Sequence, residues 1–152
     1  MPHENIARRL FLPALLANFI WINLSEIARY FWVVRPMLHE AFPGQTHIAA
    51  MDWSIFALWG IWDMVLIFGA TGFFWLWLEK FGSQWQQIVL ASLGFTLTIF
   101  GLIWLGIANM GLAPYSLLFV ALPLAWIEQL IACYIVAFFQ QRNQVPSSMR
   151  SI

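Results

Sequence analysis

The sequence predicts an all-α fold, an integral membrane four-helix bundle with both termini on the cytoplasmic side. Of the 152 residues, 62% are hydrophobic and 9% are charged, whereas soluble domains are about 25% charged. Four apolar runs are each long enough to cross a hydrocarbon core about 30 Å thick. No charged residue occurs from Phe81 to Ile127. A soluble bundle would need a charged outer face there, so we expect a membrane protein.

The first predicted span covers about residues 10–34. Pro13 falls in its first turn, where a missing N–H costs little. Pro36 is expected to end the span, because the residue before a proline disfavours helical geometry. The long loop that follows contains His39 and His47, which lack the fixed spacing of a metal site. We therefore expect solvated histidines and no metal ion.

The second and third spans are predicted at about residues 53–78 and 85–108. Tryptophans at both ends of the second span match the aromatic belts of membrane interfaces, and Gly82 suits a tight turn into the third. The third span has no charge, and small residues recur along it at helical spacing: Ala91, Gly94, Thr98, Gly101 and Ala108. Because small residues let membrane helices approach closely, this face is expected to pack against another helix.

The fourth span, about residues 115–139, carries Glu128 near its middle. Ala125 and Ala132 share a face with this acid, so Glu128 is expected on the packed side of the helix and not toward lipid. Residues 140–152 are predicted to form a loose cytoplasmic tail. With short loops throughout, the whole chain, residues 1–152, is expected to be a single transmembrane domain.

The basic residues predict the orientation of the bundle. An even number of spans places both termini on one side, together with these residues: Arg8, Arg9, Lys80, Arg142 and Arg150. The other side holds at most Arg35 and Arg29. Because positively charged flanks stay in the cytoplasm, both termini are expected there, in a multi-pass protein of the bacterial inner membrane.

Charged residues inside the spans predict an intramembrane polar site formed by Asp63, Glu128, Glu26 and Arg29. Asp63 lies roughly 15 Å along its span, near mid-depth, and Glu128 is central in the fourth. One cation among three acids leaves an excess of negative charge that a proton, a metal ion or an organic cation can balance. For Glu26 and Arg29, three residues apart, an ion pair at the membrane interface is an equal alternative.

Other side chains are expected around these charges. The polar ones are Asn18, Asn23 and Gln129. Trp59 and Trp62 bracket the turn before Asp63, and Trp126 precedes Glu128 by two residues. Such an aromatic pocket would suit a hydrophobic or cationic small molecule, although packing is the more common role of buried tryptophans.

Several functions are disfavoured. No histidine lies in a span, there is no Gly-rich phosphate loop or Cys-x-x-Cys pair, and the only cysteine is Cys133, so no cofactor is expected. No Ser/His/Asp set occurs at membrane depth, so no catalytic residue is assigned. A formal net charge of zero gives no reason to expect a nucleic-acid partner.

Four short spans with a membrane carboxylate are similar, in architecture alone, to the small multidrug exporters, in which one glutamate of the first helix serves proton and cation alike. In this chain Glu26 lies late in its predicted span, further acids occur at Asp63 and Glu128, and the first loop is long. No residue role is carried over from that family.

The sequence leaves three functions open. The first is a proton- or cation-coupled transporter or channel component in which Asp63 and Glu128 share one exchangeable site and Arg29 biases their protonation. The second, ranked almost level, is a non-enzymatic accessory or assembly subunit that docks on a larger membrane partner or on a second copy. The third, ranked below, is a lipid-modifying isomerase that uses the carboxyls as acid and base.

Overall fold

A computed structural model describes residues 2–45, 47 and 52–144. For residues 2–9, 143 and 144 it describes the backbone alone. Every regular element within these residues is helical. The elements in chain order are α1 (Pro2–Arg29), η1 (Tyr30–Val34), α2 (Arg35–Ala41), α3 (Trp53–Phe81), α4 (Trp85–Phe95), η2 (Thr96–Gly101), α5 (Leu102–Asn109) and α6 (Tyr115–Gln144). Because η1 and η2 are wide π turns that continue the helices around them, the elements form four rods. All four are long and apolar enough to cross a membrane.

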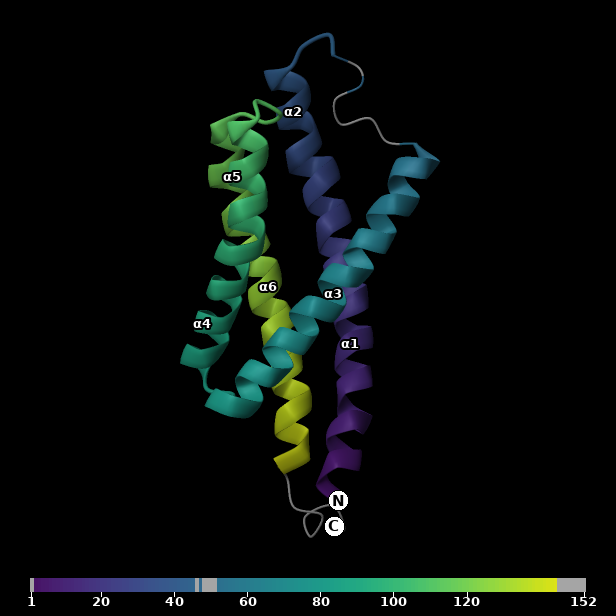
Figure 1. Ribbon diagram of the computed structural model, residues 1–152, viewed down its shortest axis with the longest axis vertical. Helices are drawn as coiled ribbons and strands as arrows, with labels where there is room; N and C mark the ends of the chain where they lie inside the picture. Colours follow the sequence, from purple (N-terminus) through teal and green to yellow (C-terminus); the bar gives the residue numbers. More distant parts are fainter. Residues whose placement is uncertain (1, 46, 48–51, 145–152) are drawn as a thin grey trace.

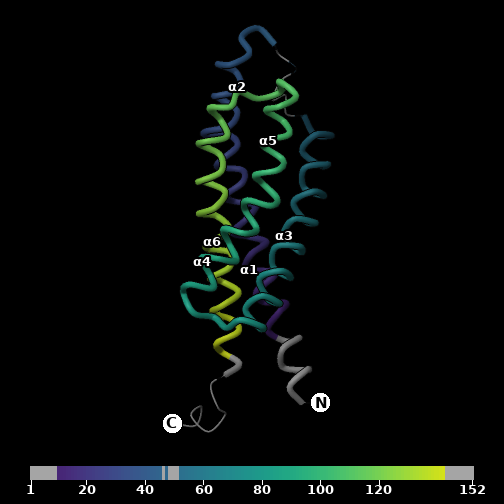
Figure 2. Tube along the Cα trace, turned by 60° about the vertical axis from the view of Figure 1, so that its left-hand side comes forward, coloured from purple at the N-terminus to yellow at the C-terminus, as the bar shows by residue number. Residues whose placement is uncertain are grey.

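The rods run up and down, as Figures 1 and 2 show. α1 begins and α6 ends at one end of the molecule, where the α3–α4 turn also lies. Gly82 in that turn has a φ of 86°, a conformation that costs glycine little. α1 and α6 pack along each other, and α3 crosses both diagonally.

The crossing of α3 divides this helix into two unequal halves. From Asp63 to Leu78 it has a continuous buried face that packs on α1, α4 and α6. From Trp53 to Trp62 it leaves the bundle, and Leu58 and Trp62 remain 66% and 56% exposed. Asp63 therefore lies where α3 separates from its neighbours.

The first rod is longer than the sequence predicted. The expected end before Pro36 is wrong, because the helix continues through η1 into α2 and ends at Ala41. A proline ring in a regular helix collides with the carbonyl one turn earlier, and the wider π turn at Tyr30–Val34 comes directly before this proline. The apolar part of the rod therefore extends from Leu10 to Ala41.

The ends of the other rods also differ from the prediction. α1 already begins at Pro2, within the expected polar lead, and α3 continues to Phe81. The expected loose tail is helical from Gln140 to Gln144, where Gln140 Nε2 donates to the Trp75 carbonyl at 2.8 Å. Residues 145–152 lie outside the described part of the chain.

The third rod packs through only part of the predicted small-residue face, in which Ala91 and Ala108 are buried. Ala91 is buried, but Gly94 and Thr98 are exposed, and a Cβ added at Gly94 would meet nothing within 4 Å. The buried face instead carries Ser92 and Thr96, which are 0% and 1% exposed. The buried face of the helix is therefore turned by about one residue from the face that carries the small residues.

Candidate functional site

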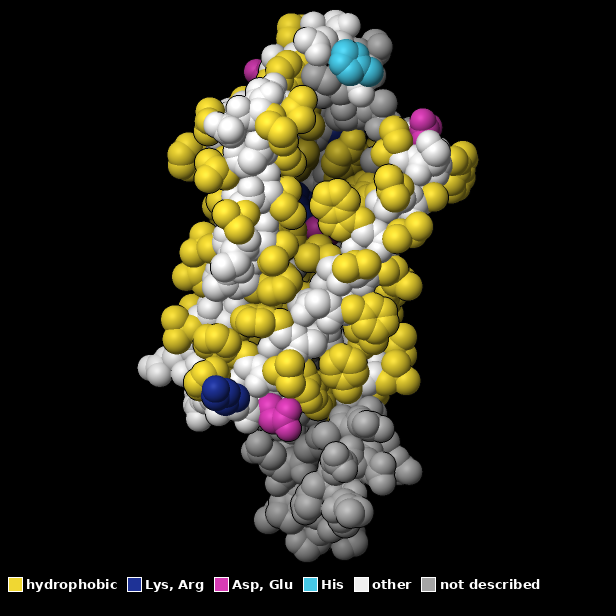
Figure 3. Space-filling model, in the orientation of Figure 1, with side chains coloured by type: hydrophobic (Ala, Val, Ile, Leu, Met, Phe, Trp, Pro, Cys, Tyr) yellow, Lys and Arg dark blue, Asp and Glu magenta, His cyan; other side chains and the backbone are white. Residues whose placement is uncertain are grey.

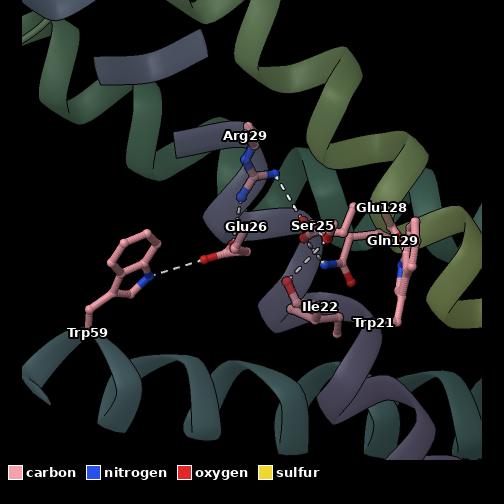
Figure 4. Close-up of polar contacts among 8 residues, drawn as sticks. All are labelled: Trp21, Ile22, Ser25, Glu26, Arg29, Trp59, Glu128 and Gln129. Atoms are coloured by element: carbon pink, nitrogen blue, oxygen red, sulfur yellow. Dashed lines mark hydrogen bonds and ion pairs between the residues drawn. The ribbon is translucent and has the colours of Figure 1, made fainter. Parts of the chain in front are cut away.

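A cluster of charged side chains joins α1 to α6 (Figure 4). Arg29 Nη2 donates to Glu26 Oε1 at 2.6 Å, and its Nη1 lies 3.6 Å from Glu128 Oε2. The guanidinium group also lies 5.4 Å from the centre of the Phe100 ring. Arg29 thus balances acids from two helices at once.

Glu128 is held by hydrogen bonds to both of its carboxylate oxygens. Ser25 Oγ donates to Oε2 at 2.5 Å, and Gln129 Nε2 donates to Oε1 at 3.0 Å. The indole of Trp21 adds a hydrogen bond of 2.9 Å to the Glu128 carbonyl. Because Ser25 and Trp21 come from α1, these contacts fix the register between α1 and α6.

Glu26 also uses both oxygens, and its second contact reaches α3. Oε1 accepts from Arg29, and Oε2 accepts from Trp59 Nε1 at 3.3 Å. Figure 4 shows the Trp59 indole directed from α3 toward Glu26. Trp59 therefore links the diverging half of α3 to the charged cluster.

Asp63 differs from the other two acids in its contacts. It is 4% exposed and lies beside Trp59 and Glu26, with Glu128 as a weaker electrostatic neighbour. Among the residues that the structure describes, none donates a hydrogen bond to its Oδ1, although this atom is buried. Since Arg29 is shared by Glu26 and Glu128, Asp63 has no cation of its own in the described cluster.

A cavity of about 440 Å³ lies above these charges, between the diverging half of α3, the first rod and the third rod. Its volume is within the usual range of ligand pockets, roughly 300–1,000 Å³. Glu26, Arg29 and Asp63 are the charged residues among those that line it. In Figure 3 the hollow lies between α3 and α5, with basic and acidic colours at its bottom.

The walls of the cavity are aromatic and aliphatic. α3 contributes Trp59 and Trp62, the first rod contributes Tyr30, and the third rod contributes Phe100 and Trp104. The Tyr30 and Trp59 rings lie edge to face with centres 5.0 Å apart. Walls of this kind suit a hydrophobic molecule, and aromatic faces also attract cations.

The chain matches no family model, and no curated protein or solved structure is significantly similar to it.

The cluster lies at the centre of its helices. Glu26 is midway along the apolar part of the first rod, Leu10–Ala41, and Glu128 is midway along Tyr115–Arg142. The sequence placed Glu26 late in a shorter span, which left an interfacial ion pair with Arg29 as an alternative. The hydrogen bond from Ser25 to Glu128 places the Glu26–Arg29 pair level with Glu128, midway along the helices.

The four charged residues that the sequence singled out come together, but three other candidates, Asn18, Asn23 and Trp126, lie elsewhere. Asn23 donates to the Phe19 carbonyl of its own helix at 2.8 Å. Trp126 faces the third rod, where its indole lies 3.3 Å from Ser92 Oγ. Neither side chain lines the cavity.

Two of the predicted accessory polar residues occupy different places. Gln129 belongs to the cluster through its contact with Glu128. Asn18 lies further toward the termini, where its Nδ2 donates to Thr71 Oγ1 at 3.0 Å. It joins α1 to α3 within the packed half of the bundle and does not reach the cavity.

Sequence reasoning missed several residues that shape the site. Serine is a common residue in apolar helices, and the role of Ser25 as a donor to Glu128 depends on helix register. Tyr30, Phe100 and Trp104 carry no sequence signal that separates a cavity wall from ordinary packing. The described part of the chain contains no cluster of His, Cys, Asp and Glu that could hold a metal ion.

Proposed function

We propose that this protein is a membrane-embedded carrier that binds a hydrophobic organic cation in the side-open cavity and exchanges it for a proton. The observation that carries the proposal is the floor of the cavity, where Asp63 has no cation partner beside a Glu26–Arg29–Glu128 network. If all groups ionise, three acids and one arginine leave two negative charges in a medium of low dielectric constant. Such an excess is stable only when a proton or another cation balances it.

The shape of the cavity favours a carrier over an ion channel. Its walls are almost entirely apolar, and its volume of about 440 Å³ is far greater than a dehydrated inorganic ion requires. It also opens to the side, between α3 and α5, so a hydrophobic molecule can enter from the lipid phase. A channel would need a polar path along the bundle instead.

The test measures cation binding and proton release together. The protein, in lipid nanodiscs, is titrated with a lipophilic arylalkylammonium ion in two buffers of different ionisation enthalpy, and calorimetry gives the affinity and the protons released. We expect proton release on binding, and at least about tenfold weaker binding without release in Asp63→Asn, because removing the charge removes a buried ion pair. The control is Glu79→Gln, an exposed acid at the far end of α3. Equal effects of the two substitutions would refute the proposal.

The alternative functions predict different results. An accessory subunit or homo-oligomer would co-purify in mild detergent with a stoichiometric membrane partner or a second copy, and its Asp63→Asn variant would lose the complex. A lipid isomerase would carry a neutral lipid-like molecule in the cavity, and Glu26 and Asp63 would act on it as base and acid. Purification followed by mass spectrometry of bound material separates these cases.

The same proposal includes the location of the protein. We place it in the bacterial inner membrane with both termini in the cytoplasm, because Lys80 and Arg142 flank the end of the bundle where α1 begins and α6 ends. Arg35, toward the opposite end, lies 5.8 Å from the Phe31 ring and is partly covered. The cavity then lies in the outer half of the bilayer, on the side away from the cytoplasm.

A further inference from the structure

The three acids at the floor of the cavity differ in their free hydrogen-bonding capacity. Both oxygens of Glu26 accept a hydrogen bond, from Arg29 and Trp59, and both oxygens of Glu128 accept one, from Ser25 and Gln129. Asp63 Oδ1 is buried and receives no hydrogen bond from any residue that the structure describes. A buried acceptor without a donor is costly, and a ligand that supplies the donor recovers this cost.

Asp63 is one of the residues that line the cavity, although its Oδ1 is buried. The residue lies at the point where α3 leaves the bundle, and it lines the cavity together with Leu58, Trp62 and Ile103. These neighbours are apolar, so the walls above the floor offer no second charge to a ligand. Arg29 lies on the same floor and disfavours a second positive group there.

We propose that the ligand of this cavity is a singly charged protonated amine with at least one N–H, which donates to Asp63 Oδ1 while its aryl or alkyl body lies between Trp62 and the third rod. This inference rests on the proposed function and narrows it to one substrate class. A quaternary ammonium ion carries the same charge but has no N–H, so it leaves Oδ1 without a donor. A neutral alcohol supplies a donor but leaves the negative charge unbalanced.

Sites that hydrogen-bond one group of a ligand reject an analogue without that group, because the buried acceptor is then left unpaired. We therefore expect the amine to bind at least about tenfold more tightly than its quaternary analogue, which is a modest value for such a site. The preference depends on Asp63 and not on the aromatic walls, since cation–π contacts favour both ions.

The experiment compares three ligands of one shape on the unmodified protein: 4-phenylbenzyl-dimethylamine in its protonated form, 4-phenylbenzyl-trimethylammonium and 4-phenylbenzyl alcohol. Binding to nanodiscs is followed by tryptophan fluorescence, and partitioning into protein-free nanodiscs is subtracted. Asp63→Asn and the control Glu79→Gln are then titrated with the same ligands, after thermal unfolding has shown that each variant is folded. The comparison on the unmodified protein stands even where Asp63→Asn does not fold.

The outcomes separate the inference from the function on which it rests. Binding in the order amine, then quaternary ion and alcohol, with the preference lost in Asp63→Asn and kept in Glu79→Gln, supports the inference. Equal affinity for the amine and the quaternary ion overturns the inference but leaves the cation carrier standing. Tightest binding of the alcohol, or no saturable binding of either cation, overturns both.

Discussion

At the scale of single residues, the three acids of the charged cluster differ in their partners, because Glu26 and Glu128 share Arg29 whereas Asp63 has no cation among the described residues. The sequence indicated that Asp63 and Glu128 share one site, since both lie near the middle of their spans. The structure places Glu26 nearer to Asp63, whereas Glu128 is enclosed by Ser25, Gln129 and Arg29. Sequence periodicity can assign each acid to a depth, but it cannot tell which two acids meet, because that depends on helix rotation.

Arg29 is expected to be essential for stability. Arg29→Met leaves Glu26 and Glu128 buried without their common cation, and both carboxylates are less than a tenth exposed. Losing one partner of a buried ion pair costs on the order of 3–5 kcal/mol. Unfolding in mixed micelles should show a loss of that order, and a smaller loss in Arg29→Met/Glu128→Gln, in which Glu26 alone is left without its cation. The control Lys80→Met, at an exposed position, should change little.

If the double substitution is as unstable as the single one, the arginine stabilises the bundle through Glu26 or through packing on Phe100 and not through Glu128. Double-mutant analysis is suited to this distinction, because it isolates the interaction energy of two neighbouring side chains.

Asp52 is expected to cap α3 in a pH-dependent manner. Its Oδ1 accepts from Ser54 Oγ at 2.6 Å and from the Ser54 and Ile55 amides at 2.9 Å. The hydrogen bond from the Ser54 hydroxyl, and then that from the Ile55 amide, hold the pKa of Asp52 below its ordinary value. A lowered pKa means that the cap is complete above about pH 4 and is lost as the pH falls through the folded-state pKa.

The amide resonances of Ser54 and Ile55 should report this cap in NMR spectra at decreasing pH. They should shift with a midpoint below about 3.9, the ordinary pKa of aspartate. Asp52→Asn should keep the cap at neutral pH, because asparagine caps helices equally well, but remove the titration. A midpoint at or above the ordinary value would show that the carboxylate is not bonded to these amides.

At the scale of helices, the sequence predicts that a helix exists better than it predicts where the helix ends or which face is packed. The four apolar runs correspond to four helical rods, because burial of the backbone in an apolar medium leaves helices as the simplest structure. The predicted end of the first rod was wrong. The expectation that a helix stops before a proline applies to a regular α-helix, whereas η1 widens the turn before Pro36. The packed face of the third rod was predicted only in part, because Ala91 and Ala108 are buried whereas Gly94 and Thr98, although small, are exposed.

Two substitutions on the third rod should therefore have opposite outcomes. Ala91 is 1% exposed, so Ala91→Leu must displace neighbours, and overpacking of this kind costs about 1–3 kcal/mol. Gly94 is exposed, with open space around an added Cβ, so Gly94→Leu should be tolerated. Thermal unfolding of both variants measures the contrast. If Gly94→Leu is equally destabilising, this face packs against a second copy or a partner.

At the scale of the whole molecule, the site depends on the tilt of α3. Its packed half carries Thr71, which bonds Asn18 on α1, while its other half diverges and opens the cavity beside Asp63. Both halves are mostly apolar in sequence, so their composition does not show which half is buried and which is open. The cavity forms because of the angle between helices, which is a property of the assembled bundle. The sequence of α3 alone therefore does not predict it.

The orientation of the bundle is the last prediction, and it follows from how the charges are distributed between its ends. Because Arg29 lies inside the cluster, Arg35 is the flanking basic residue toward one end of the described bundle, against Arg8, Arg9, Lys80 and Arg142 toward the other. Such a bias places the second end in the cytoplasm. Single cysteines at Gly44 and at Gln84, in a chain whose buried Cys133 is replaced by alanine, test this. Gly44→Cys, in the loop after α2, should react with an impermeant maleimide on intact cells, and Gln84→Cys should react only after lysis. The reverse labelling pattern would invert the bundle, place the cavity in the cytoplasmic half of the bilayer and refute the orientation.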